Sequence, residues 1–228
     1  MLKLYYKNKL LIFMSRLFEN RRLFTPIQLS IYTLRDYGVW PQKLIALDAF
    51  CQTGLQWTRI FSKHASYLEM WDIDPLPLKY ARKEFPDAEV VCGDSVEAFK
   101  QMGFKRKDFN FILADTPVPF MFPDGSFEHF GFFSDIFKNI AEEAVIIFDV
   151  VPDINKMLAR HPHDERFTES WRQARCKFYN VSGGSLITPD KMINAYTRIL
   201  NELGLTVRLI QYNARNEYFG FISLAVKR

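Results

Sequence analysis

The sequence has little cysteine and no pattern that puts cysteine to structural use. Its three cysteines, Cys51, Cys92 and Cys176, are widely spaced, and no CxxC or Cys/His cluster is present. His161 and His163 flank a proline without carboxylate or cysteine partners at ligand spacing. These absences argue against a zinc site or a disulfide framework, and we expect no metal. The cysteine usage favours a reducing, cytoplasmic compartment.

Long hydrophobic runs are absent as well. The apolar run Leu10–Met14 spans five residues, too few for the core of a signal peptide or for a membrane span, so no membrane partner is expected. The sequence also lacks internal repeats, low-complexity segments and the G-x-G-x-x-G pattern of dinucleotide-binding proteins. What is present is a chain of 228 residues, 48% hydrophobic, which is long enough to bury a large core in one domain.

Charge is unevenly spread along the chain. The net charge is +4, but residues 1–43 carry +6 and residues 44–228 carry −2. A basic segment ahead of a mildly acidic body suggests a polyanionic partner such as a nucleic acid. The same cations would also serve simply to solubilise an aromatic-rich helix, or the segment awaits a protein partner. We therefore expect a basic N-terminal helical extension over 1–43 and a folded domain over 44–228.

From residue 44 onward, short apolar runs alternate with amphipathic segments. This rhythm is typical of βαβ units and a parallel sheet covered on both faces. The sequence predicts strands near 44–50, 67–71, 88–92, 109–114 and 144–148, with helices near 55–63, 75–85, 95–102 and 128–141. A final helix (188–203) precedes two strands (205–212 and 219–226) whose short link suits an antiparallel hairpin. The predicted fold class is α/β, a three-layer αβα doubly wound sheet, mostly parallel with a C-terminal antiparallel hairpin.

Residues 151–189 interrupt this rhythm. The segment is polar, and a stretch of this length between elements is uncommon unless it is functional or partly helical, so we interpret it as an insertion or lid. Within it, residues 166–179 combine basic and aromatic side chains at helical spacing. They predict a phosphate-binding and base-stacking surface for a nucleic acid, or alternatively a solvated basic helix over the sheet edge; the residues concerned are Trp171, Arg172, Arg175, Lys177 and Tyr179.

Polar residues follow each of the first four predicted strands, where an open α/β sheet binds its ligands. The segments are Asp48-Ala-Phe-Cys-Gln-Thr-Gly54, Asp72-Ile-Asp-Pro75, Gly93-Asp-Ser95 and Asp115-Thr-Pro117. Over residues 44–150, their order and spacing resemble the class I, Rossmann-like methyltransferases that use S-adenosylmethionine (SAM). The first segment resembles the D-x-F-x-G-x-G form of nucleic-acid methyltransferases, except that Gln52 stands at the family's first glycine.

The resemblance implies a SAM site and the residues that form it. Asp72 would accept hydrogen bonds from the ribose hydroxyls and Asp94 from the adenine amino group, while Asp48 and the Gly54 turn would lie at the amino-acid end of SAM. The complete set of implied cofactor-binding residues is Asp48, Phe50, Gly54, Asp72, Ile73, Asp94 and Ser95.

The resemblance also implies that the methyl acceptor lies against the fourth segment, with Asp115, Pro117 and Phe120 as catalytic residues. Asp115 would act as a base or hydrogen-bond acceptor, and Phe120 would stack on a planar acceptor. Thr116 and Val118 depart from the N/D-P-P-aromatic loop of DNA amino-methyltransferases, and none of the cysteines suits cytosine-C5 methylation.

Three functions stay open at this point. The first is a SAM-dependent methyltransferase whose acceptor is a nucleic acid or a nucleotide-like molecule. The second is a small-molecule methyltransferase with residues 151–189 as its lid. The third is a catalytically degenerate protein of this fold that acts as a partner subunit, which the replacement at Gln52 favours.

Overall fold

The computed structural model describes residues 24–116, 128–160, 169–184 and 186–228. Its strands are β1 (Leu44–Asp48), β2 (Ala65–Asp72), β3 (Glu89–Cys92), β4 (Phe109–Ala114), β5 (Ile140–Val150), β6 (Thr206–Ala214) and β7 (Gly220–Lys227). Its longer helices are α2 (Pro26–Asp36), α4 (Pro75–Glu84), α5 (Ser95–Gln101), α7 (Ile154–Arg160), α8 (Glu169–Tyr179) and α9 (Pro189–Glu202). The short elements are α3 (Thr58–Phe61), η1 (Ser62–His64), η2 (His129–Gly131), α6 (Phe133–Ile136) and η3 (Phe137–Asn139).

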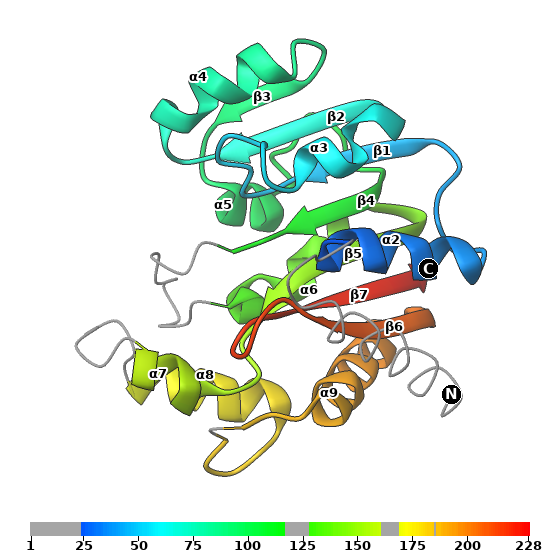
Figure 1. Ribbon diagram of the computed structural model, residues 1–228. Helices are drawn as coiled ribbons and strands as arrows, with labels where there is room; N and C mark the ends of the chain where they lie inside the picture. The colour runs from blue at the N-terminus through cyan, green and yellow to red at the C-terminus, as the bar shows by residue number, and fades with distance from the viewer. Residues whose placement is uncertain (1–23, 117–127, 161–168, 185) are drawn as a thin grey trace.

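The strands form one seven-stranded sheet in the order β3-β2-β1-β4-β5-β7-β6 (Figure 1). The first five strands run parallel, and β7 pairs antiparallel with both β5 and β6. This arrangement confirms the predicted α/β class, including the C-terminal hairpin. The strand order reverses between β1 and β4, so the switch point at which such sheets bind ligands lies at the carboxyl ends of these two strands.

Each face of the sheet carries its own apolar core. One core joins the inward side chains of α5, α6 and α9 to the sheet, among them Phe99, Ile136 and Tyr196. The other joins those of α2, α3 and α4, among them Leu34 and Phe61. Helices on both faces explain why the parallel strands are apolar along most of their length.

Helix α2 belongs to this body rather than standing apart from it. Thr25 caps the helix and Gln28 returns a bond to the Thr25 backbone N–H, which completes a capping box. Its buried face packs against β6 and β7, where the Ser30 hydroxyl accepts hydrogen bonds from Asn213 and Ser223. The described part of the predicted N-terminal extension therefore belongs to one helical layer of the fold, together with α3 and α4.

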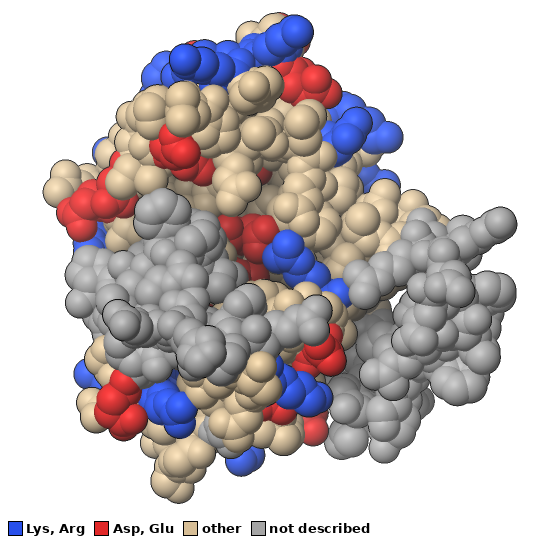
Figure 2. All heavy atoms as spheres, turned by 60° about the vertical axis from the view of Figure 1, so that its left-hand side comes forward, with Lys and Arg blue, Asp and Glu red and all other residues tan. Residues whose placement is uncertain are grey.

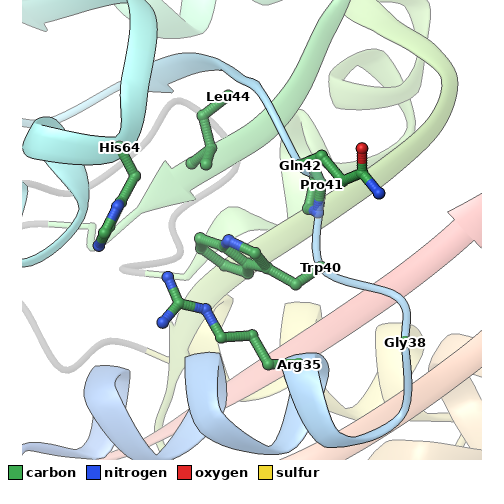
Figure 3. A pocket seen from close by; sticks show the side chains of 7 residues that line it. All are labelled: Arg35, Gly38, Trp40, Pro41, Gln42, Leu44 and His64. Carbon is green, nitrogen blue, oxygen red and sulfur yellow. The ribbon is translucent and has the colours of Figure 1, made fainter.

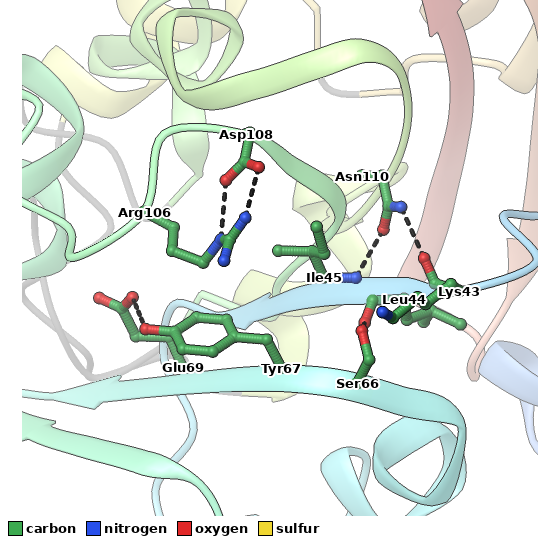
Figure 4. A network of polar contacts seen from close by, with 9 residues as sticks. All are labelled: Lys43, Leu44, Ile45, Ser66, Tyr67, Glu69, Arg106, Asp108 and Asn110. Carbon is green, nitrogen blue, oxygen red and sulfur yellow. Dashed lines mark hydrogen bonds and ion pairs between the residues drawn. The ribbon is translucent and has the colours of Figure 1, made fainter.

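Polar contacts fix the register at the amino ends of the central strands (Figure 4). The Asn110 amide bridges β4 to β1, because it accepts from the Ile45 N–H and donates to the Lys43 carbonyl, both at 2.8 Å. Ser66 at the start of β2 donates to the Leu44 carbonyl. These bonds hold β1 between β2 and β4 and thereby align the residues that follow each strand.

The predicted helix over 128–141 is wrong. This stretch forms three short pieces, η2, α6 and η3, and the last residues of the predicted helix begin β5 at Ile140. Its buried residues are spaced as on one helical face, which is why a helix was expected. In the structure Phe132 stacks on Phe99, whereas Phe133 contacts Phe148 and Tyr196. Asn139 in η3 donates to the carbonyls of Phe99 and Asp135 just before β5 begins.

The interrupting segment 151–189 is partly helical, as its length suggested, with α7 and α8 in its described part. Val151, Ile154, Met157 and Trp171 form a small separate core beside the hairpin residues Tyr218 and Phe219. Across the residues that can be described, no helix has the length and apolar character needed to cross a membrane.

Candidate functional site

The carboxyl ends of four adjacent strands bring aspartates together. Asp72 ends β2, Asp48 ends β1, Asp115 follows β4, and Asp149 lies near the end of β5. In the parallel register Asp48 faces Leu113 and Ala114 faces Phe148, so Asp115 and Asp149 occupy matching places on neighbouring strands. This edge turns toward the viewer in Figure 2, where acidic side chains line the floor of a hollow beside basic ones. We call the four residues Asp72, Asp48, Asp115 and Asp149 the aspartate row.

Asp48 is buried at the centre of this row, only 2% exposed. Its Oδ2 accepts the hydroxyl hydrogen of Thr58, which opens α3, whereas no donor in the described residues reaches Oδ1 at hydrogen-bonding geometry. Burial raises the pKa of Asp48 to about 7, against the lowering by Thr58, and Asp115 adds to the rise. Asp48 is thus a carboxyl that holds a proton near neutral pH.

Asp72 organises two turns. Its Oδ2 accepts from the Gln52 N–H at 2.8 Å and its Oδ1 from the Asp74 N–H at 2.9 Å. Gln52 has a left-handed φ of 48°, the conformation for which glycine is the usual residue. The replacement noted in the sequence is therefore accommodated by strain of order 1 kcal/mol, and the bond to Asp72 helps to hold it.

Gly54 serves packing as well as backbone conformation. Its φ is 70°, and a Cβ at this position would lie 2.5 Å from a ring carbon of Phe85 and 2.7 Å from the methyl group of Met70. The close approach that requires glycine is thus to the protein's own core. The glycine explains the shape of the turn and does not by itself indicate a ligand.

The remaining residues of the predicted cofactor set divide between the surface and the core. Ile73 is 56% exposed beside Asp72, where a flat apolar group could rest on it. Asp94 caps α5, since its Oδ1 accepts from the N–H groups of Val96 and Glu97. Ser95 is buried, and Phe50 is half-buried 5.9 Å from the ring of Phe132.

Asp115 is held on two sides. The indole N–H of Trp57 donates to its Oδ2 at 2.5 Å, and Arg215 of the β6–β7 link lies 3.3 Å from its Oδ1. The Arg215 guanidinium also lies over the rings of Trp57 and Phe221. Burial raises the pKa of Asp115, while Arg215 and Trp57 lower it. The other predicted catalytic residues, Pro117 and Phe120, lie outside the described residues.

Asp149, which is buried in the same row, was not among the predicted site residues. Both the N–H and the hydroxyl of Thr116 donate to its Oδ1, at 2.8 and 2.6 Å. Burial and then the neighbouring Asp115 raise the pKa of Asp149 well above its usual value. A carboxyl inside the otherwise apolar run Ile146-Ile-Phe-Asp-Val150 was the available signal.

A buried ion pair anchors α8 to Glu128, the residue that precedes η2. Arg175 lies 2.6 Å from Glu128, and both side chains are fully buried. Glu128 also accepts the N–H of Val151, and the hydroxyl of Tyr179 lies 3.5 Å from the same oxygen. The Tyr179 hydroxyl is also hydrogen-bonded to the Tyr196 hydroxyl, at 3.0 Å. This network joins α8, β5 and α9.

The network corrects the surface predicted for residues 166–179. Trp171, Arg175 and Tyr179 recur every four residues, so they share the inward face of α8 and are buried. Burial removes these three side chains from any phosphate-binding or stacking surface, and only Arg172 and Lys177 of the predicted set are exposed. The buried cation is used to neutralise Glu128.

His129 is part of the same network and not a candidate base. Its Nε2 lies 2.8 Å from the Tyr196 hydroxyl, and its ring is buried against Phe148. Burial lowers the pKa of His129 to about 3, so the ring is neutral at physiological pH. No three His, Cys, Asp or Glu side chains within the described ranges are arranged to hold a metal ion.

A separate cavity of about 300 Å³ lies at the opposite, amino end of β1 (Figure 3). Trp40 forms one wall, Arg35 lies over its ring at 5.5 Å, and His64 approaches from η1. Burial, together with Arg35 and Lys63, lowers the pKa of His64. The cavity is cationic and aromatic, and it is remote from the aspartate row.

No protein-family model matches the sequence, and no curated protein matches it. Solved structures do match in fold. The N-methyltransferase NodS from Bradyrhizobium japonicum WM9 has a TM-score of 0.53 at 13% identity, over 88% of this chain and 94% of that one. The plantazolicin methyltransferase BamL, solved with S-adenosylhomocysteine (SAH), has a TM-score of 0.52 at 11% identity, over 85% and 80%.

Trm5b from Pyrococcus abyssi is a third match, with a TM-score of 0.51 at 13% identity over 87% of this chain. The match covers 48% of Trm5b, so this chain spans about half of that protein's length. At such identities the likeness concerns the fold alone. With its sheet order and C-terminal hairpin, this chain has the fold of the class I methyltransferases.

Proposed function

We propose that this protein is a SAM-dependent methyltransferase whose acceptor is a nucleic acid or a nucleotide-like molecule. The observation that carries the proposal is the aspartate row at the switch point of a methyltransferase fold. SAM bears an ammonium and a sulfonium, and clustered buried carboxyls suit cations. The complexes named for matching structures, such as BamL with SAH, support the same cofactor class.

The residues fit SAM at its cationic end more clearly than at its carboxylate. Asp48 supplies a buried oxygen that no described donor reaches at full hydrogen-bonding geometry, and Ile73 beside Asp72 offers an apolar surface for adenine. The Gln52 N–H, in the turn that would face the carboxylate of SAM, instead donates to Asp72. Rotation of this turn away from Asp72 would free both the N–H and the carboxylate for the ligand.

Bound SAM supplies an electrophilic methyl group, and the chain's own task is to align an acceptor with it. Asp115 is the described residue best placed to accept a hydrogen bond from the acceptor's N–H or O–H group. Arg215 and Trp57 hold its carboxyl in place, so Asp115 acts first as a positioning group. Proton removal by Asp115 requires that Arg215 release one carboxylate oxygen.

Calorimetric titration with SAM and SAH tests the cofactor assignment. We expect micromolar binding of both ligands, because SAM and SAH would contact the same aspartate row and the same exposed Ile73. Asp72→Ala should weaken SAM binding by roughly 10- to 150-fold, the effect of losing hydrogen bonds to a charged group of about 1.5–3 kcal/mol. Asp36→Ala on the exposed face of α2 is the control. Unchanged affinity in Asp72→Ala would show that the ribose lies elsewhere.

The strained turn at Gln52 favours a second candidate, a degenerate member of this fold that acts as a partner subunit. The variant Gln52→Gly separates the two candidates. If the wild-type protein binds no SAM up to about 1 mM, an affinity weaker than about 4 kcal/mol, and Gln52→Gly restores binding, the site is degenerate. Micromolar binding by the wild-type protein would show that the cofactor site is not degenerate.

Two cationic regions support a polyanionic acceptor. They are the basic segment before α2 and the cavity lined by Arg35, Trp40 and His64. We expect the protein to bind a 20-nucleotide RNA or DNA with an affinity that falls steeply between about 50 and 200 mM salt. Arg21→Ala/Arg22→Ala should weaken binding several-fold, whereas the matched pair Lys79→Ala/Lys83→Ala on α4 should not. Equal effects of the two pairs, measured by fluorescence anisotropy, would refute a specific role of the basic segment.

A further inference from the structure

Two carboxyls of the aspartate row are buried without a cationic partner among the residues that the structure describes. Asp48 and Asp149 are each 2% exposed, and their side-chain partners in the described residues are the neutral hydroxyls of Thr58 and Thr116. Buried carboxylates in proteins are normally paired with a positive charge. The guanidinium of Arg215 pairs with Asp115. The row therefore contains more potential negative charge than the described part of the chain neutralises.

The remaining oxygen of Asp48 points to a ligand. Its Oδ1 is buried and accepts no hydrogen bond at normal geometry, although the Phe50 N–H faces the carboxyl and lowers its pKa. A buried oxygen of this kind costs about 1–3 kcal/mol when it is left without a donor. A bound group that places positive charge near Asp48 removes that cost.

The charged groups around the row mostly repel further negative charge. Asp72 from β2 and Asp115 from β4 act on Asp48, and Glu128 and Asp115 act on Asp149. The Cys51 thiol lies beside Asp48, and burial raises its pKa so that it carries no charge. Arg215 is the cation that acts on Asp115. Burial raises the pKa of Asp48 to about 7 and that of Asp149 well above its usual value.

These contacts lead to a role for Asp149 that depends on the cofactor assignment made above. We propose that Asp48 and Asp149 make this edge of the sheet selective for a cationic ligand, because they exchange protons for it. Without a cation, burial favours the protonated form of both side chains. When the sulfonium of SAM binds, an O–H bond of the pair breaks, the proton passes to solvent, and the resulting carboxylate pairs with the sulfonium.

The same exchange discriminates against the product of methyl transfer. SAH has a neutral thioether in place of the sulfonium and keeps only the α-ammonium, so it should draw fewer protons from the pair than SAM does. Asp149, which is not among the residues that the family resemblance implies, is thus a specificity-determining residue. Its effect on SAM comes through charge, since Thr116 already fixes the carboxyl by two hydrogen bonds to one oxygen.

Calorimetry in two buffers of different ionisation enthalpy measures the exchange directly. The full chain is titrated with SAM and with SAH at pH 6.5 in phosphate and in imidazole, which both take up protons at this pH. The α-amino group of each ligand stays protonated there, because its pKa is about 8. We expect release of roughly half to one proton per SAM bound and a smaller release per SAH. The ratio of SAM affinity to SAH affinity should therefore rise with pH.

Asp149→Asn should lower the proton release and narrow the preference for SAM by roughly tenfold. Glu84→Gln, an exposed carboxyl on α4, is the matched control and should change neither quantity. Equal proton release with SAM and SAH in the wild-type protein would overturn this inference while leaving the cofactor assignment in place. Failure of both ligands to bind would overturn the two together. The wild-type comparison decides the matter even if Asp149→Asn does not fold.

Discussion

Arg175→Met should destabilise the protein by about 3–5 kcal/mol, the cost of leaving a buried carboxylate without its cation. Arg175 and Glu128 are both fully buried and 2.6 Å apart, so water cannot replace the lost partner. For a domain of this size the change corresponds to a fall in Tm of roughly 6–20 °C. Thermal and urea unfolding of the purified variant measure it. Arg172→Met, an exposed residue of the same helix, should change stability by less than about 0.5 kcal/mol.

The double variant Arg175→Met/Glu128→Gln tests the cause of that loss. Removing the second charge should recover part of the stability, because a neutral amide costs less to bury than an unpaired carboxylate. The glutamine carbonyl can still accept the Val151 N–H. A double variant that is less stable than Arg175→Met would mean that packing, rather than charge, dominates at this position. A loss in Arg175→Met as small as that in Arg172→Met would contradict the burial of the pair.

The central part of the site could be predicted because it depends on local rules. Asp48, Asp72 and Asp115 each follow an apolar strand, and parallel strands bring their carboxyl ends to one edge of the sheet. The same rules explain why Asp94 follows β3, although its observed bonds show helix capping. A single sequence position can therefore satisfy a motif and a local structural need together.

The residues that were missed depend on contacts between distant segments. Asp149 lies within an apolar strand without a turn to mark it, and its importance comes from Thr116 and Asp115 on the neighbouring strand. Arg175 and Glu128 are 47 positions apart. In the sequence, Arg175 contributes to the basic character of α8, which favoured a surface helix. In the structure the helix buries Arg175 against the carboxylate of Glu128.

The spacing of buried residues explains why a single helix was expected between β4 and β5. Phe132, Phe133 and Phe137 are buried at a spacing that suits one helical face, and they join the core with α5 and α9. The sequence therefore predicts one helix here. It could not predict the three short pieces, because their ends are set by tertiary contacts such as those of Asn139 with Phe99 and Asp135.

The raised pKa values of the aspartate row predict an unusual dependence of stability on pH. Asp48 has a pKa of about 7 in the folded chain, against 3.8 for the free side chain. Between these values the folded state binds a proton that the unfolded state has released, so the free energy of unfolding falls as pH rises through this range. For Asp48 alone the difference corresponds to roughly 4 kcal/mol, and burial of Asp149 acts in the same direction.

Unfolding followed from pH 4.5 to 8.5 should therefore give a higher Tm near pH 5 than near pH 8. Asp48→Asn should flatten this dependence, because the amide has no proton to lose, whereas Glu84→Gln should leave its slope unchanged. A bound cation should stabilise the fold as protonation does, because it offsets the charge of the ionised carboxylates. SAM should therefore raise the Tm more at pH 8, where the row is ionised, than at pH 5. A wild-type Tm that is equal at pH 5 and pH 8 would show that the row is neutralised in solution. The carboxyls would then be poor determinants of cofactor charge, and the functional proposal would rest on the fold alone.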